Sequence, residues 1–90
     1  MRNSDSVPDL KAKRTQVGIL AEILELCRKP TAKTRIMYKT NMSHLGVQKF
    51  TKQLQKLELL RFDGHAAKYV TTEKGLEFIK RYAALRGLLK

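Results

Sequence analysis

Apolar residues along this chain follow two different periods, and the change between them limits the folds that it can adopt. Residues 44–58 carry apolar side chains at every third or fourth position, which predicts an amphipathic helix. Residues 59–71 instead alternate apolar and polar side chains around Asp63 and Gly64, which predicts a β-hairpin with its tip near residues 63–66. The core side of the helix is predicted to consist of Val47, Phe50, Leu54 and Leu57.

The first predicted helix covers residues 14–28. Its apolar side chains form two neighbouring stripes that cover more than half of the circumference, so we expect the helix to be buried on two sides. Pro30 ends it, because proline lacks the N–H group that would continue the hydrogen-bond ladder. Cys27 lies on one of the apolar stripes, and we expect it to be a buried structural thiol.

Further signals complete the order of elements. Residues 31–40 predict a short helix, and Asn41 tolerates the left-handed backbone that would close it. Ser43 is a favourable N-cap for the helix that follows, and Thr72 is one for a last helix over residues 73–90. Helix, short helix, turn, helix, hairpin and helix is the order of a helix-turn-helix with a wing, and it predicts an α+β, mostly helical fold.

The charge of the chain favours a polyanionic partner. Nineteen Lys and Arg residues oppose eight Asp and Glu residues, which gives a net charge of +11. Such a surplus favours nucleic acid first and an anionic membrane surface second. No acidic residue lies between Arg28 and Leu57, the stretch that covers the predicted helix-turn-helix. The basic residues of this stretch are Arg28, Lys29, Lys33, Arg35, Lys39, Lys49, Lys52 and Lys56.

These basic residues and their polar neighbours form the predicted DNA-binding site. The helix over 44–58 would enter the major groove, where Gln48 can pair with adenine and Lys49 can contact guanine or phosphate. Ser43 and His44 lie at the start of this helix, where backbone N–H groups favour phosphate. The full predicted set, with two cations of the hairpin, is Lys33, Arg35, Lys39, Ser43, His44, Gln48, Lys49, Lys52, Lys56, Arg61 and Lys68.

The sequence favours a binding protein over an enzyme. It shows no glycine-rich phosphate loop, no nucleophile pattern and no metal-ligand spacing, so we expect no catalytic residue, metal, cofactor or small-molecule substrate. No apolar run has the length of a membrane span or the pattern of a signal peptide, and a cytoplasmic, nucleoid-associated protein is expected. Tyr38 is expected to pack beside the core, and His65 to lie in a solvated loop.

A resemblance to a known family covers residues 14–90. It rests on the segments KTRIMYKTNMSHLGVQKFTKQLQKLELLRF and YVTTEKGLEFIKRY, which are similar to archaeal winged helix-turn-helix proteins, including small dimeric chromatin proteins of about ten kilodaltons. The resemblance implies the order α-β-α-α-β-β-α, with a short first strand near residues 30–32. It also implies a homodimer joined by the last helix as an antiparallel coiled coil, and a role as chromatin-organising protein or transcriptional regulator.

The last helix carries two apolar stripes. We expect Leu76, Ile79 and Ala83 to pack on the domain itself, which leaves a second stripe at coiled-coil spacing for a partner subunit. The predicted dimer interface is Phe78, Tyr82, Leu85 and Leu89. The expected parts of the chain are a flexible basic arm over residues 1–12, a winged helix-turn-helix DNA-binding domain over 13–72, and a dimerisation helix over 73–90.

Two other functions stay open at the level of sequence. A winged helix can be a protein-interaction module, although an apolar or acidic face would then be expected where this chain has lysines. RNA binding is the other alternative, although the major groove of double-stranded RNA is too narrow for a helix.

Overall fold

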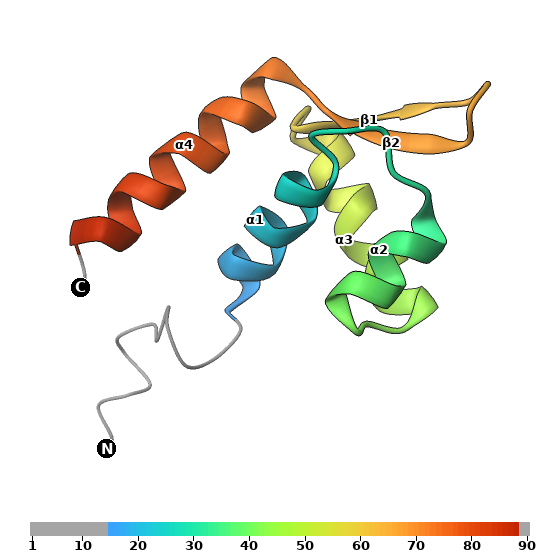
Figure 1. The fold of residues 1–90 in the computed structure, drawn as a ribbon, viewed down its shortest axis with the longest axis horizontal. Coiled ribbons are helices and arrows are strands. Elements are labelled where there is room, and N and C mark those ends of the chain that lie inside the picture. Colours follow the sequence, from blue (N-terminus) through green and yellow to red (C-terminus); the bar gives the residue numbers. More distant parts are fainter. Residues whose placement is uncertain (1–14, 89–90) are drawn as a thin grey trace.

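The structure, a computed structural model, describes residues 15–88 of the chain. Its helices and strands follow the order expected from the sequence, and this mostly helical α+β arrangement confirms the predicted fold class (Figure 1). The predicted basic arm over residues 1–12 and the predicted interface residue Leu89 lie outside the described residues. The elements are α1 (Gln16–Leu26), α2 (Lys33–Thr40), α3 (His44–Lys56), β1 (Leu60–Asp63), β2 (Lys68–Thr71) and α4 (Glu73–Leu88).

The core lies between the first three helices and the base of the hairpin. Ile23, Leu24 and Cys27 at the end of α1 expose no surface, and Ile36 of α2 and Leu54 of α3 belong to the same buried cluster. The expected burial of Cys27 is confirmed. This burial raises the pKa of the Cys27 thiol to about 12, so the thiol stays protonated and unreactive at neutral pH.

Polar side chains fix the ends of the helices. The Ser43 Oγ accepts a hydrogen bond of 3.1 Å from the backbone N–H of Gly46, and this caps α3. The Thr72 Oγ1 accepts one of 3.0 Å from the N–H of Gly75 and caps α4 in the same way. Asn41 takes a left-handed backbone with a φ of 56° and ends α2. The three capping predictions are therefore confirmed.

α3 ends earlier than its apolar spacing predicts. The helix stops at Lys56, because Glu58 takes a left-handed backbone with a φ of 63°. Leu57 is consequently 46% exposed, and its predicted place in the core is wrong. Leu59, beyond the turn, is the residue that enters the core instead.

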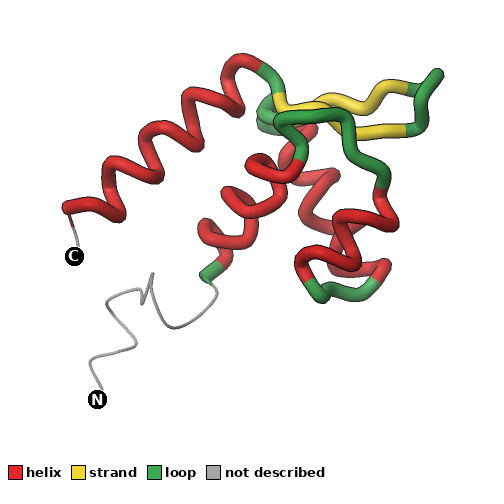
Figure 2. Tube along the Cα trace, in the orientation of Figure 1, coloured by secondary structure: helices red, strands yellow, loops and turns green. Residues whose placement is uncertain are grey.

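The hairpin is attached to the loop that follows α1. Phe62 of β1 lies opposite Tyr69 of β2, and their ring centroids are 4.9 Å apart. Thr31 exchanges two backbone hydrogen bonds with Tyr69, at 3.0 and 2.8 Å. Figure 2 shows this loop running beside the strands. The strand that the resemblance implied near residues 30–32 is thus a single β-bridge.

α4 packs on α1 through side chains that the sequence assigned to a partner subunit. Phe78 packs against the core beside Ile79. Tyr82 is half-buried, with its hydroxyl beside Gly18 of α1. Phe78 and Tyr82 therefore pack within their own domain, whether or not they also contact a second subunit.

The predicted inner stripe of α4 is wrong at two positions. Leu76 and Ala83 are exposed, although they were expected to face the domain. The reason is Gly75, which is buried and whose missing Cβ leaves room for the carbonyl oxygen of Leu59. α4 therefore turns its Gly75 side inward, and residues three, four and seven positions further along the helix follow. Both stripes are apolar, so spacing alone could not select one.

We predict that Gly75→Ala destabilises the fold, because the new methyl group would overlap the Leu59 carbonyl oxygen. The expected loss in the free energy of unfolding is about 1–3 kcal/mol. Gly87→Ala is the matched control in the same helix, since nothing lies within 4 Å of the added Cβ, and alanine favours a helix over glycine. Thermal and urea unfolding of both variants tests this, and equal stability of the two would contradict the close packing of α4.

Candidate nucleic-acid interface

One side of α3 carries a continuous row of exposed side chains, all but one of them polar or basic. α3 buries Val47, Thr51 and Leu54 on its inner side. The opposite side holds exposed residues at positions i, i+3, i+4, i+7 and i+11, which lie one above another on a helix. We call this row the α3 stripe, and it consists of Leu45, Gln48, Lys49, Lys52 and Lys56.

The lysines of the α3 stripe form no ion pair within residues 15–88. The ion pairs there join Glu25 to Arg28 at 3.6 Å and Glu77 to Arg81 at 2.8 Å, on α1 and α4. Charges of both signs lie together at that end of the molecule, where Glu25, Glu73 and Glu77 line a shallow groove between α1 and α4 with Arg28 and Lys80. The stripe therefore presents uncompensated positive charge, which suits a row of phosphate groups.

A contact between α2 and α3 brings two other predicted residues together. The Nζ of Lys33 lies 3.3 Å from the Nε2 of His44, at the N-terminal ends of the two helices. A lysine ammonium only donates hydrogen bonds, so the Nε2 atom of His44 is the acceptor in this contact. The pair places a positive charge beside the free backbone N–H groups of α3, a position favourable to an anion. Sequence spacing gave no signal for this pair.

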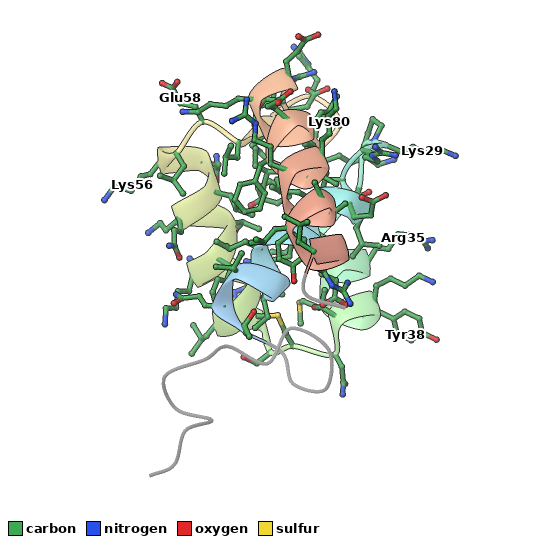
Figure 3. All side chains as sticks on the ribbon, turned by 90° about the vertical axis from the view of Figure 1, so that its left-hand side faces the viewer. Lys29, Arg35, Tyr38, Lys56, Glu58 and Lys80 are labelled. Carbon is green, nitrogen blue, oxygen red and sulfur yellow. The ribbon has the colours of Figure 1, made fainter. Side chains whose placement is uncertain are left out.

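Arg35 of α2 does not continue the α3 stripe. Figure 3 places Lys56 on one side of the molecule and Arg35 and Tyr38 on the opposite side. Tyr38 is 82% exposed, so the expectation that it packs beside the core is wrong. α2 turns Ile36 and Thr40 inward, and Tyr38, two positions from each, faces away from both. The acid-free stretch of the sequence is thus divided between two sides of the fold.

The hairpin presents both of its predicted cations on one face. Arg61 lies opposite Val70 in the strand register, and Lys68 lies opposite Asp63. Because side chains alternate between the faces of a strand, these two pairs share a face. Arg61 and Lys68 are exposed. The tip is held by Asp63, whose Oδ1 accepts a hydrogen bond of 3.0 Å from the backbone N–H of His65.

Residues 15–88 contain no cluster of three or more histidine, cysteine, aspartate or glutamate side chains that could hold a metal ion. None of the helices in that range is long and apolar enough to cross a membrane.

Comparison with known structures gives a similar fold. The chain is similar to Lactococcus lactis ZitR, wild type, with a TM-score of 0.67, 26% sequence identity, and coverage of 86% of this chain and 57% of the ZitR chain. It is similar to a mutant of ZitR with a TM-score of 0.63, 25% identity, and coverage of 87% and 56%. The chain thus spans little more than half of the ZitR length. Comparison with curated protein sequences gave no significant match.

A family model described as winged helix-turn-helix matches residues 13–90. The match includes every described element, from the helix before the helix-turn-helix to the helix after the wing. With α2, the turn and α3 as the helix-turn-helix and β1–β2 as the wing, this chain belongs to the winged helix-turn-helix family.

Proposed function

We propose that this chain binds double-stranded DNA as a homodimer, with α3 in the major groove and the wing on the adjacent backbone. The observation that carries the proposal is the α3 stripe, an exposed row of lysines and one glutamine without an acidic neighbour on its helix. In a helix-turn-helix, the second helix is the one that lies in the groove. We place such a protein with the nucleoid DNA of the cytoplasm, as a chromatin-organising protein or a transcriptional regulator.

The stripe divides into a part that reads bases and a part that contacts phosphate. The N-terminal residues of a recognition helix reach the base edges, and Gln48, in the second turn, can pair with the N6 and N7 atoms of adenine. Lys52 and Lys56 lie one and two turns further on, where a lysine serves as a point charge for the backbone. Arg61 and Lys68 would contact phosphates on the side of the wing.

The proposed role of the N-terminal end of α3 is to hold a phosphate. Ser43, His44 and Lys33 meet there, and the hydroxyl of Ser43 can still donate a hydrogen bond while it caps the helix. Arg35 and Lys39 remain proposed DNA contacts, but they would not touch the same stretch of DNA as the α3 stripe. Figure 3 shows Arg35 on the side of the molecule away from Lys56. They would contact only DNA that extends past α2.

The homodimer is proposed from α4. Leu85 is 49% exposed and Leu88 is 83% exposed, which leaves apolar surface in water unless a second subunit covers it. Phe78 and Tyr82 stack at 6.5 Å between centroids, and because both are only partly buried they would border such an interface. The first half of α4 carries acidic side chains and the second half basic ones, so an antiparallel pair opposes unlike charges.

Regulatory and architectural roles differ in base specificity. Selection of bound sequences from a pool of random duplexes separates them. A regulator would enrich a defined operator, whereas an architectural protein would enrich no operator.

One prediction of this proposal concerns how the affinity for DNA depends on salt concentration. If Lys49, Lys52, Lys56, Arg61 and Lys68 each contact a phosphate, the logarithm of the association constant should fall with the logarithm of salt concentration at a slope of about −4 to −5 per subunit. Lys52→Ala should reduce the magnitude of this slope by about one. Fluorescence anisotropy with a labelled duplex measures it, and duplex RNA of the same sequence should bind more weakly.

Lys80→Ala is the matched control, because Lys80 is an exposed lysine of α4 that lines the groove beside Glu73 and Glu77, away from α3 and the wing. It removes the same charge and should leave the slope unchanged. Binding that is insensitive to salt, or an equal loss from Lys52→Ala and Lys80→Ala, would contradict the proposed DNA face.

A second prediction concerns the oligomeric state. Sedimentation equilibrium should show a dimer of the wild type and a monomer of Leu85→Lys, because the lysine would bring two like charges into an apolar interface. Leu45→Lys makes the same change at an exposed leucine of α3 and should stay dimeric. A monomeric wild type, or a dimeric Leu85→Lys, would rule out an interface centred on Leu85.

A further inference from the structure

Leu45 is an apolar side chain in an otherwise polar row. It lies in the first turn of α3 and is 74% exposed, while the other members of the α3 stripe are one glutamine and three lysines. The core does not use it, since Val47 and Leu54 supply the buried side of the helix. An exposed leucine at the end of the helix proposed to enter DNA would be covered only in the complex.

The major groove offers a leucine few apolar partners. The thymine C5-methyl group is the apolar group that an A·T pair presents there, and on the same edge the adenine presents its N6 and N7 atoms. Gln48 lies one turn after Leu45 on the same stripe, and an amide side chain is the usual partner of those adenine atoms. A leucine and a glutamine at this spacing therefore match the two features of A·T pairs.

We propose that Leu45 contacts a thymine methyl group and that, with Gln48, it makes the α3 stripe prefer A·T base pairs. This inference rests on the proposed DNA binding by α3 and names the bases that this face reads. The lysines of the stripe add affinity without this preference, because a lysine bonded to phosphate carries no sequence information.

The first turn of α3 is held in place before any DNA arrives. The Ser43 hydroxyl caps it through the N–H of Gly46, and Lys33 contacts His44 from α2. Gly46 leaves space for the Met42 side chain, which packs against the core; a Cβ there would lie 3.2 Å from the Met42 Cε. The backbone that carries Leu45 is thus fixed on both sides, which favours a defined contact over a loose one.

The test removes only the thymine C5-methyl groups from the DNA. Two duplexes of one A·T-rich sequence are compared, one with thymine and one with deoxyuridine at every thymine position, so that no binding register has to be known. The wild-type chain should bind the thymine duplex about fourfold more tightly for each methyl group that Leu45 covers. Leu45→Ala should bind both duplexes equally, and Leu45→Met should keep the preference. Alanine suits an exposed helix position, so the fold should persist.

The outcomes separate this inference from the proposed function. Equal binding of the two duplexes by the wild type would overturn the role of Leu45 and leave DNA binding intact. A thymine preference as large in Leu45→Ala as in the wild type would also overturn it, since any effect of the methyl groups on duplex shape acts on both proteins alike. Failure of the wild type to bind either duplex would overturn the proposed function, and the inference with it.

Discussion

The fold depends on Thr71, which joins the wing to the end of α1. Its hydroxyl donates a hydrogen bond of 2.6 Å to the carbonyl oxygen of Leu24, and its N–H donates one of 2.8 Å to the carbonyl oxygen of Cys27. The next residue, Thr72, donates its N–H to Leu59 at 3.0 Å and caps α4. Two consecutive threonines thus connect α1, the strands, the end of α3 and the start of α4. The orientation of the wing relative to α3 follows from these bonds, because a buried polar group left without its partner is costly.

The second constraint is that, in the described part of the chain, charges are paired on α1 and α4 but not on α3. Acidic side chains lie along α1 and α4, where Glu25 and Glu77 are already paired with arginines. Among residues 15–88, the cations of the α3 stripe and the wing have no such partners. A polyanion is therefore attracted most strongly to α3 and the wing, and α4, which exposes Leu85, is a separate element. The proposed DNA binding by α3 and the proposed pairing through α4 thus use different elements of the domain.

Apolar spacing and capping residues predicted the fold well, and the errors have physical causes. The α3 helix, its cap and the hairpin could be predicted because each depends on neighbouring residues. Leu57 was misplaced because a left-handed residue, Glu58, ends the helix two residues early. The inner side of α4 was misplaced because Gly75 selects it through a contact with a distant carbonyl group. The candidate site was also predictable only where it depends on neighbouring residues. The α3 stripe could be predicted from spacing, but the outward position of Tyr38 depends on which side of α2 packs against the core.

The central claim is that α3 and the wing form one DNA-binding face. Titration of the isotope-labelled protein with an A·T-rich duplex, followed by amide chemical shifts, tests it residue by residue. The account predicts the largest shift changes in residues 43–56 and 61–68, with little change in α1 and in the first half of α4. Changes confined to α1 and α4, with α3 and the wing unaffected, would contradict it.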